Sequence, residues 1–331
     1  LLQEHRAIGY PSHALNCPEN RRFDIFTQQI INGLVLGSIY ALVALGYTMV
    51  YGILELINFA HGEVTMFGAM ICLAVMSALL GAGVDLPGLM IVLIGLGAAI
   101  LACMVLGFTI ERIAYRPLRR APRLAALITA IGVSIVLQNV AMLIWGKQYI
   151  SFPPLLPVVR YEILGASITN LQILIIVLSC LLMMGLWWLV SRTKLGSAMR
   201  ATAQAPDVAG LMGININTII SITFILGAAI AAVAGVMVSA YYGLAHYHMG
   251  FMLGLKAFTA AVLGGIGKVN GAVLGGLLLG LIESLASGYI GDLTGGFLGS
   301  HYQDVFAFFV LILVLVFRPS GLLGERVAER A

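Results

Sequence analysis

A long apolar stretch from Gly33 to Met76 is interrupted in its middle by the polar segment Asn58-Phe-Ala-His-Gly-Glu63. Each polar side chain buried in hydrocarbon costs several kcal/mol unless a hydrogen-bond partner or a water-filled cavity receives it. An Asn, a His and a Glu placed so close together are therefore incompatible with a helix that faces lipid on all sides. We expect this interruption to face a path lined by protein.

The composition indicates a polytopic membrane protein. Apolar residues make up 60% of the chain, charged residues only 10%, and the mean hydropathy is +1.02, far outside the range of soluble domains. At least six apolar runs, each about 17–25 residues long, could span the roughly 30 Å of a bilayer core as helices. These runs leave no room for a soluble enzymatic domain, and the net charge of +4 does not indicate nucleic-acid binding.

The cysteines indicate neither a metal site nor a disulfide framework. Cys17, Cys72, Cys103 and Cys180 are scattered singly, without a CxxC pair or a Cys/His spacing typical of metal ligands. We expect them to be small buried side chains, and we expect no metal to be bound.

The chain divides into three parts. Residues 1–22 are polar and lack the apolar core of a signal peptide, so we predict a disordered extension. Residues 23–324 form the transmembrane domain, with a cytoplasmic loop at 192–217, and residues 325–331 form a cytoplasmic tail.

Basic residues in the connections predict the orientation, because cytoplasmic loops are enriched in Lys and Arg. Three connections are basic, so we expect both termini to be cytoplasmic and the first span, Gln28 to Leu45, to run outward. The connections near residues 81–88, 146–170 and 291–302 would then lie outside. The basic residues are Arg112, Arg116, Arg119, Arg120, Arg123, then Arg192, Lys194, Arg200, then Arg318, Arg326 and Arg330.

Two segments do not fit this path as full crossings. Gly46–Leu80 and Met252–Tyr289 would each begin and end outside, so we interpret each as a half-helix, a break near mid-membrane, and a returning helix. Matching breaks suggest two related halves in an all-α membrane protein with about 8–10 transmembrane helices. The competing layout makes every half-helix a complete crossing, which gives about ten spans.

The two breaks supply the candidate residues of a translocation pathway. His61 and Glu63 flank Gly62, where they could pair with each other, satisfy backbone groups freed by the break, line the path or form a proton relay. Lys256 is expected to reach the outer interface rather than to contact substrate, and Glu283 to face the bundle interior. The full set of pathway or break residues is Glu55, Asn58, His61, Gly62, Glu63, Lys256, Gly264, Gly265, Gly267 and Asn270.

Catalytic and nucleotide-binding motifs are not found. The segment Gly264-Gly-Ile-Gly-Lys268 looks like a phosphate-binding loop, but Val262 and Val269 occupy positions where a Walker A motif needs Gly and Ser or Thr. No nucleophile elbow or HExxH pattern occurs either. We therefore expect no enzymatic activity and no cofactor bound by this chain.

The segment from Arg192 to Asn217 predicts a docking element. Pro206-Asp207 begins a short helix with an acidic residue at its positive end, and Gly213-Ile-Asn215 ends it. A short capped helix on a tight membrane loop suits contact with a partner, although an ordinary interfacial connection is the alternative.

Several motifs together resemble one family. They are INGLVLGSIYALVALGYTMVYGI, INFAHGE, ERIAYRPLR, LITAIGVSIVLQN, GLKAFTAAVLGGIGKVNGAVLGG and RPSGLLG. From about Phe23 to Gly324 the chain is similar to the permease subunits of branched-chain amino acid ABC importers, which are related to ribose-type and urea-type permeases and have a type II-like fold.

The resemblance implies a coupling helix from Ala203 to Gly213 that contacts an ATPase. The family's acidic residue after the alanines is less clear here, where Gln204-Ala-Pro-Asp207 stands in its place. The residues assigned to this helix are Ala203, Ala205, Asp207, Gly210, Leu211 and Gly213.

The resemblance also implies partners and a location. The partners are a paralogous permease, two cytoplasmic ATPases that bind ATP and Mg²⁺, and an external substrate-binding protein, around a multi-pass chain in the bacterial cytoplasmic (inner) membrane. The implied function is inward transport of leucine, isoleucine and valine by alternating access. Transport of urea or short amides by the same machine, and proton-coupled transport using His61, Glu63 and Glu283, are the alternatives.

Overall fold

The computed structural model describes residues 18–83, 85–119, 121–155, 157–163, 165–293, 302–318 and 320–324. Seven helices in these ranges are long and apolar enough to cross a membrane, and two shorter helices, Met249–Gly264 and Asp304–Phe317, are also apolar. This confirms the predicted all-α polytopic class. The extension at residues 1–17, Cys17, Arg120 and the tail at 325–331 lie outside the described residues.

The helices of the first half are α1 (Pro18–Leu54), α2 (His61–Gly81), α3 (Gly88–Ile110), a π-helical turn η1 (Glu111–Tyr115) and α4 (Arg123–Trp145). A region of short strands follows, with β1 (Ile150–Ser151), β2 (Arg160–Ile163) and β3 (Ala166–Thr169). The rest of the chain contains α5 (Asn170–Arg192), α6 (Lys194–Gln204), α7 (Pro206–Leu211), α8 (Ile216–Tyr242), β4 (Leu244–Ala245), α9 (Met249–Gly264), α10 (Val269–Leu293) and α11 (Gln303–Phe317).

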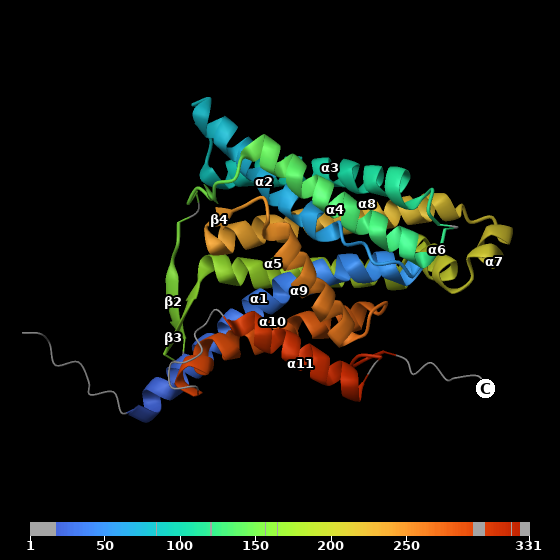
Figure 1. The fold of residues 1–331 in the computed structure, drawn as a ribbon. Helices are drawn as coiled ribbons and strands as arrows, with labels where there is room; N and C mark the ends of the chain where they lie inside the picture. The colour runs from blue at the N-terminus through green and yellow to red at the C-terminus, as the bar shows by residue number, and fades with distance from the viewer. Residues whose placement is uncertain are drawn as a thin grey trace, which may run out of the picture.

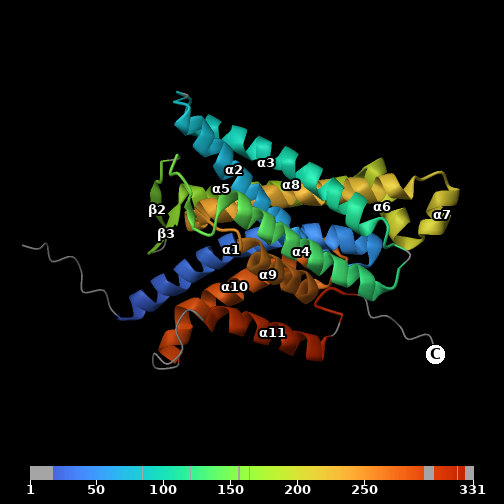
Figure 2. The ribbon, with the colours of Figure 1, turned by 45° about the horizontal axis from the view of Figure 1, so that its top comes forward.

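The bundle has two distinct ends (Figure 1). At the strand end, β2 pairs antiparallel with β3 and β1 pairs antiparallel with β4. At the opposite end, which we call the α7 end, α6 and α7 extend beyond the long helices (Figure 2). At this end Arg119 donates a hydrogen bond to Asn217 of α8. The basic connections near residues 112–119 and 192–200 therefore lie at the same end of the bundle, as predicted.

The predicted placement of the start of α1 at the same end as the basic connections is wrong. Gln28, near the start of α1, exchanges hydrogen bonds with the backbone of Ser167 in β3, at 3.1 Å and 2.8 Å. The helix therefore begins at the strand end, whereas α11 ends at the α7 end (Figure 1). The described termini lie at opposite ends of the bundle, because two full crossings, α1 and α2, stand where the prediction had one full crossing and a pair of half-helices.

The difference comes from Gly46, where we predicted that a new half-helix begins. Instead α1 continues through Gly46 for 37 residues and ends at Leu54, and α2, with 21 residues, is long enough for a full crossing. Glu55, with a left-handed φ of 52°, begins the break after α1. The first half-helix pair is therefore wrong.

The second break has the predicted order of elements. The 16-residue helix α9 is followed by a glycine-rich connection and then by α10, which returns toward the strand end. Because the first break separates two long helices and the second follows a short one, the two halves of the chain do not repeat the same pattern.

Close packing of small residues holds the centre together. A β-carbon at Gly33 or Gly37 of α1 would lie 2.8 Å from the Cα of Leu281 or Leu277 of α10, closer than real contacts allow. The apolar windows of α1 and α8 are 72% buried, whereas that of α4 is 17% buried and those of α3 and α5 are 22% buried. Helices α1 and α8 therefore form the core, whereas α3, α4 and α5 present apolar side chains to lipid or to another subunit.

We predict that Gly280→Ala destabilises the bundle, because its new methyl group would overlap the backbone of Gly37 and Gly33. Overpacking of this kind typically costs about 1–3 kcal/mol. The matched control is Gly185→Ala in α5, where nothing lies within 4 Å of the added carbon. The thermal unfolding midpoint of the detergent-purified protein should fall for Gly280→Ala only, and equal midpoints would contradict the packing described here.

Candidate functional site

The first break is held in place by η1, the turn that follows α3. Asn58 is buried, and the Tyr115 hydroxyl donates toward its Oδ1 at 3.1 Å and toward the backbone oxygen of Ile57 at 3.3 Å. Tyr115 was not singled out in the sequence, although it lies in the ERIAYRPLR motif. Glu55, by contrast, is exposed, so it does not belong to the buried part of the break.

His61 and Glu63, in the first turn of α2, are both buried but face different neighbours. The His61 ring stands edge-on to Tyr47 at 4.9 Å between ring centroids, against the bare Cα of Gly46. Glu63 faces α4, where its Oε1 accepts hydrogen bonds from Ser134 and Gln138. No hydrogen bond joins His61 to Glu63 in the described structure, so of the four possibilities given for these residues the structure excludes pairing with each other.

Lys256 does not reach toward the outer interface as predicted. Its Nζ lies 2.7 Å from Glu283 Oε1 and 2.7 Å from Asp304 Oδ1, which ties α9 to α10 and α11. Glu283 is 1% exposed and Lys256 is 12% exposed. Removing one partner of such a group leaves the remaining charge buried without compensation. Glu283 thus faces the interior as expected, with Lys256 as its partner.

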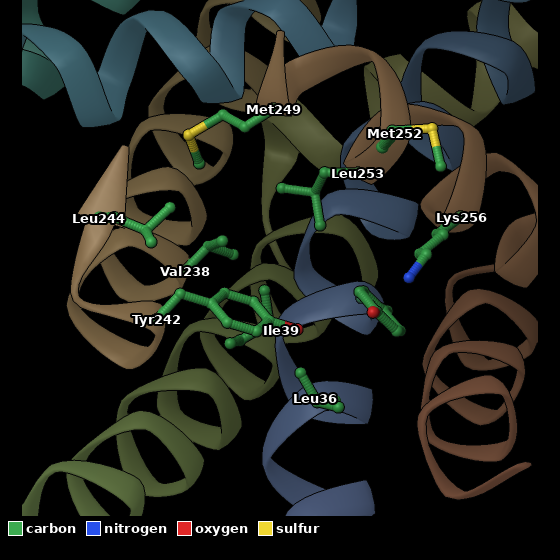
Figure 3. A pocket seen from close by; sticks show the side chains of 10 residues that line it. Leu36, Ile39, Val238, Tyr242, Leu244, Met249, Met252, Leu253 and Lys256 are labelled. Atoms are coloured by element: carbon green, nitrogen blue, oxygen red, sulfur yellow. The ribbon is translucent and has the colours of Figure 1, made fainter. Parts of the chain in front are cut away.

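Lys256 also borders a largely apolar cavity of about 170 Å³ (Figure 3). The walls come from α1, α8 and α9 and from Leu244 of β4, and the Lys256 amine lies at one edge. Leu36, Leu253 and Met249 are among the apolar side chains that point into it.

The second break depends on glycine and on the end of the chain. Gly265 and Gly267 have left-handed φ values of 106° and 92°, which side chains rarely adopt. Backbone N–H groups of Leu322 and Leu323 donate to the carbonyls of Leu263 and Gly264, which satisfies the C-terminal end of α9.

The two breaks lie close together. Phe59 of the first break packs against Phe258 of α9 at 5.7 Å between ring centroids, and a β-carbon on Gly52 would lie 3.6 Å from the Gly267 carbonyl oxygen.

Three other residues of the predicted pathway set differ in their surroundings. Gly62 packs against Gly254, and Gly264 packs against Gly271. Asn270, by contrast, is exposed on the first turn of α10.

The predicted docking helix is shorter than expected. Pro206 begins α7 at a sharp turn at Ala205, so Ala203 belongs to α6, and Gly213 follows α7 with a φ of 83°. Asp207 and Gly210 are exposed. Three apolar side chains project into solvent at 57%, 87% and 79% exposure, and they are Val208, Leu211 and Met212.

A buried carboxylate, that of Glu111, links the start of α8, which follows α7, to the first break. Glu111, at the start of η1, is 0% exposed, forms an ion pair with Arg119, and accepts a hydrogen bond from Ser221 of α8 at 2.7 Å. Four residues later in the same turn, Tyr115 binds Asn58. The start of α8 and the break between α1 and α2 are therefore connected through η1.

The described residues hold no group of three side chains suited to a metal ion. Cys72 and Cys103 are buried as expected, whereas Cys180 is exposed on α5, so that prediction is wrong for Cys180.

Comparison with known proteins decides the class. Residues 29–315 match the family described as branched-chain amino acid transport system, permease component. The chain belongs to this family. It is a multi-pass membrane permease of the ABC transport class and not an enzyme. Membership implies that the permease works with ATPase and binding-protein subunits.

Curated relatives agree over almost their whole length. The permease is 45% identical to the high-affinity branched-chain amino acid transport system permease protein LivH of Escherichia coli K12, covering 94% of this chain and 99% of LivH. It is 48% identical to the corresponding protein BraD of Pseudomonas aeruginosa, covering 92% and 98%. The probable LivH of Methanocaldococcus jannaschii is 27% identical, covering 91% and 94%.

Among solved structures, PsaBC from Streptococcus pneumoniae in complex with Fab is 12% identical, with a TM-score of 0.41 over 90% of this permease and 91% of that chain. A likeness at this level does not establish a shared fold.

We predict that Lys256→Met destabilises the permease by about 3 kcal/mol, because it leaves the Glu283 carboxylate buried without its cation. Lys194→Met, at an exposed position of α6, is the matched control. Adding Glu283→Gln to Lys256→Met should restore part of the lost thermal midpoint. A midpoint unchanged by Lys256→Met would mean that the ion group contributes nothing to stability.

Proposed function

We propose that this chain is the permease subunit of an ABC importer for leucine, isoleucine and valine in the bacterial cytoplasmic (inner) membrane. Its proposed partners are a paralogous permease, two ATPase subunits and an external binding protein. The observation that carries the proposal is the match to LivH and BraD at 45–48% identity over nearly their whole length.

The α7 end faces the cytoplasm in this proposal. The basic residues of the 112–119 and 192–200 connections support that orientation, because cytoplasmic loops are enriched in Lys and Arg. The start of α1 then lies on the external side.

We assign α7 as the helix that contacts an ATPase. Val208, Leu211 and the following Met212 are exposed apolar side chains, and a group of such side chains typically marks an interface with a partner. Buried Ala209 anchors the helix from behind. When ATP binding draws the two ATPases together, α7 moves with them, and the permease alternates between outward-open and inward-open states.

Motion of α7 has a direct route to the first break. The start of α8 is bonded to Glu111 through Ser221, and η1 carries both Glu111 and Tyr115, which binds Asn58. A shift of α8 therefore displaces the break between α1 and α2. The amino acid crosses without chemical change, this chain binds no cofactor, and ATP and Mg²⁺ are bound by the ATPases.

Uptake measurements test this function. Proteoliposomes containing the permease, its paralogue, active ATPases and the binding protein should accumulate leucine, and a hydrolysis-dead ATPase pair should abolish that uptake. Leucine uptake that persists without hydrolysis but collapses with an uncoupler would favour a proton-coupled transporter. ATP-driven uptake of urea but not of leucine would mean that the chain belongs to an ABC importer whose substrate is urea.

We predict that Val208→Asp prevents the ATPase subunits from co-purifying with the permease, because it places a charge in an apolar contact. Leucine uptake should fall at least tenfold, while the thermal midpoint stays unchanged because Val208 is 57% exposed. Val158→Asp, at a residue 60% exposed near the strand end, is the matched control and should retain the ATPases. Normal co-purification with Val208→Asp would refute the assignment of α7.

A further inference from the structure

A second cavity, of about 280 Å³, lies between α1, α4, α9 and the first break. Phe59, Ile135, Phe251 and Leu255 contribute apolar walls. Ser134 and Gln138 of α4 supply polar groups one helical turn apart, and Tyr47 and His248 also border the cavity. We call this cavity the α4–α9 groove.

A buried carboxyl group, that of Glu63, lies behind the polar wall. Glu63 is 0% exposed, and its Oε1 accepts hydrogen bonds from the Ser134 hydroxyl at 3.0 Å and the Gln138 amide at 2.8 Å. Its second oxygen, Oε2, is buried without a hydrogen-bond partner among the described residues, beside the backbone of Gly250 in α9. A carboxylate buried in this way requires compensation that the described structure supplies only in part.

The polar wall suits an ammonium group. With its amide nitrogen directed at Glu63, Gln138 retains its amide oxygen as an acceptor, and the Ser134 hydroxyl can accept one more hydrogen bond. The Glu63 carboxyl group behind them accepts a hydrogen bond from each, so the acceptor groups of this wall are left for a hydrogen-bond donor such as an ammonium group. The apolar walls offer a branched aliphatic side chain a place outside water. An acyl chain of a lipid would use the walls but leave the polar groups and the carboxylate uncompensated.

We propose that the α4–α9 groove binds the transported amino acid during its passage, with the ammonium group at Gln138 and Ser134 and the aliphatic side chain between Phe59, Ile135 and Phe251. Glu63 positions Gln138 and Ser134 through the hydrogen bonds that its Oε1 accepts. This inference rests on the proposed function, and it adds a substrate site within the permease itself.

Photo-crosslinking of the complete transporter tests the site. The probe is a leucine analogue with a diazirine in its side chain, applied to the reconstituted complex with its binding protein and ATP. Labelling should map to α4 or α9 residues of the groove and should be competed by leucine. Labelling confined to other segments, or labelling that leucine does not compete, would overturn the assignment and would indicate that lipid or the paralogous permease fills the groove.

Two variants and one control complete the test. Gln138→Leu removes the acceptor, and Ile135→Trp fills the groove while leaving the Glu63 hydrogen bonds intact. Each should lower leucine uptake at least tenfold and lower crosslinking in parallel. The control is Asn139→Leu, because the Asn139 amide is exposed and, among the described residues, donates to the Ile135 carbonyl of its own helix. It should keep uptake within twofold of the wild type.

The outcomes separate the two proposals. If the wild-type complex imports leucine but Gln138→Leu and Ile135→Trp both transport at the wild-type rate, the groove is not the site and the importer function stands. If the wild-type complex does not import leucine at all, the proposed function fails, and this inference fails with it.

Discussion

The structure depends on one constraint, which is that a polar group at membrane depth must find its partner within the protein. Asn58 is bound by Tyr115, Glu63 by Ser134 and Gln138, and Glu283 by Lys256. In each case the partner comes from another helix, so each group also joins two elements that would otherwise contact each other only through apolar packing. The polar residues that interrupt the apolar stretches thereby set which helices are neighbours.

Small residues make these partnerships possible, because they let helices approach closely enough for short side chains to meet. Glycines face one another along α1 and α10, and Gly62 packs against Gly254 where α2 crosses α9. Hydrocarbon solvates apolar side chains as well as the protein interior does, so apolar burial alone does not drive the helices together. Close backbone contact and buried hydrogen bonds therefore specify this bundle.

The sequence predicted the class, the polar first break, the glycine-rich second break and the projecting α7 segment, because each has a local signature in composition or turn chemistry. It did not predict that α1 continues through Gly46, since an apolar run contains no signal for where one helix stops and the next begins. Gly46 serves packing instead, by admitting the His61 ring. That one misplaced boundary accounts for the wrong predicted placement of the start of α1.

Partners distant along the chain were not predictable in the same way. Tyr115 is separated from Asn58 by the whole of α2 and α3, and Asp304 lies two helices beyond Lys256. Such pairs depend on which helices are neighbours in space, and hydropathy does not report this. The groove beside Glu63 was likewise not foreseen, because its walls come from α1, α4 and α9 together.

The contact between Leu322, Leu323 and the end of α9 has a consequence for biogenesis. A membrane protein emerges from the ribosome in order, and α9 is made well before the residues that satisfy its last carbonyls. Until those residues arrive, the last carbonyls of α9 lack these backbone partners. An internal part of the bundle is therefore completed only after α10 and α11 have been made, so residues 322 and 323 act as a late closing element for the folding of the permease.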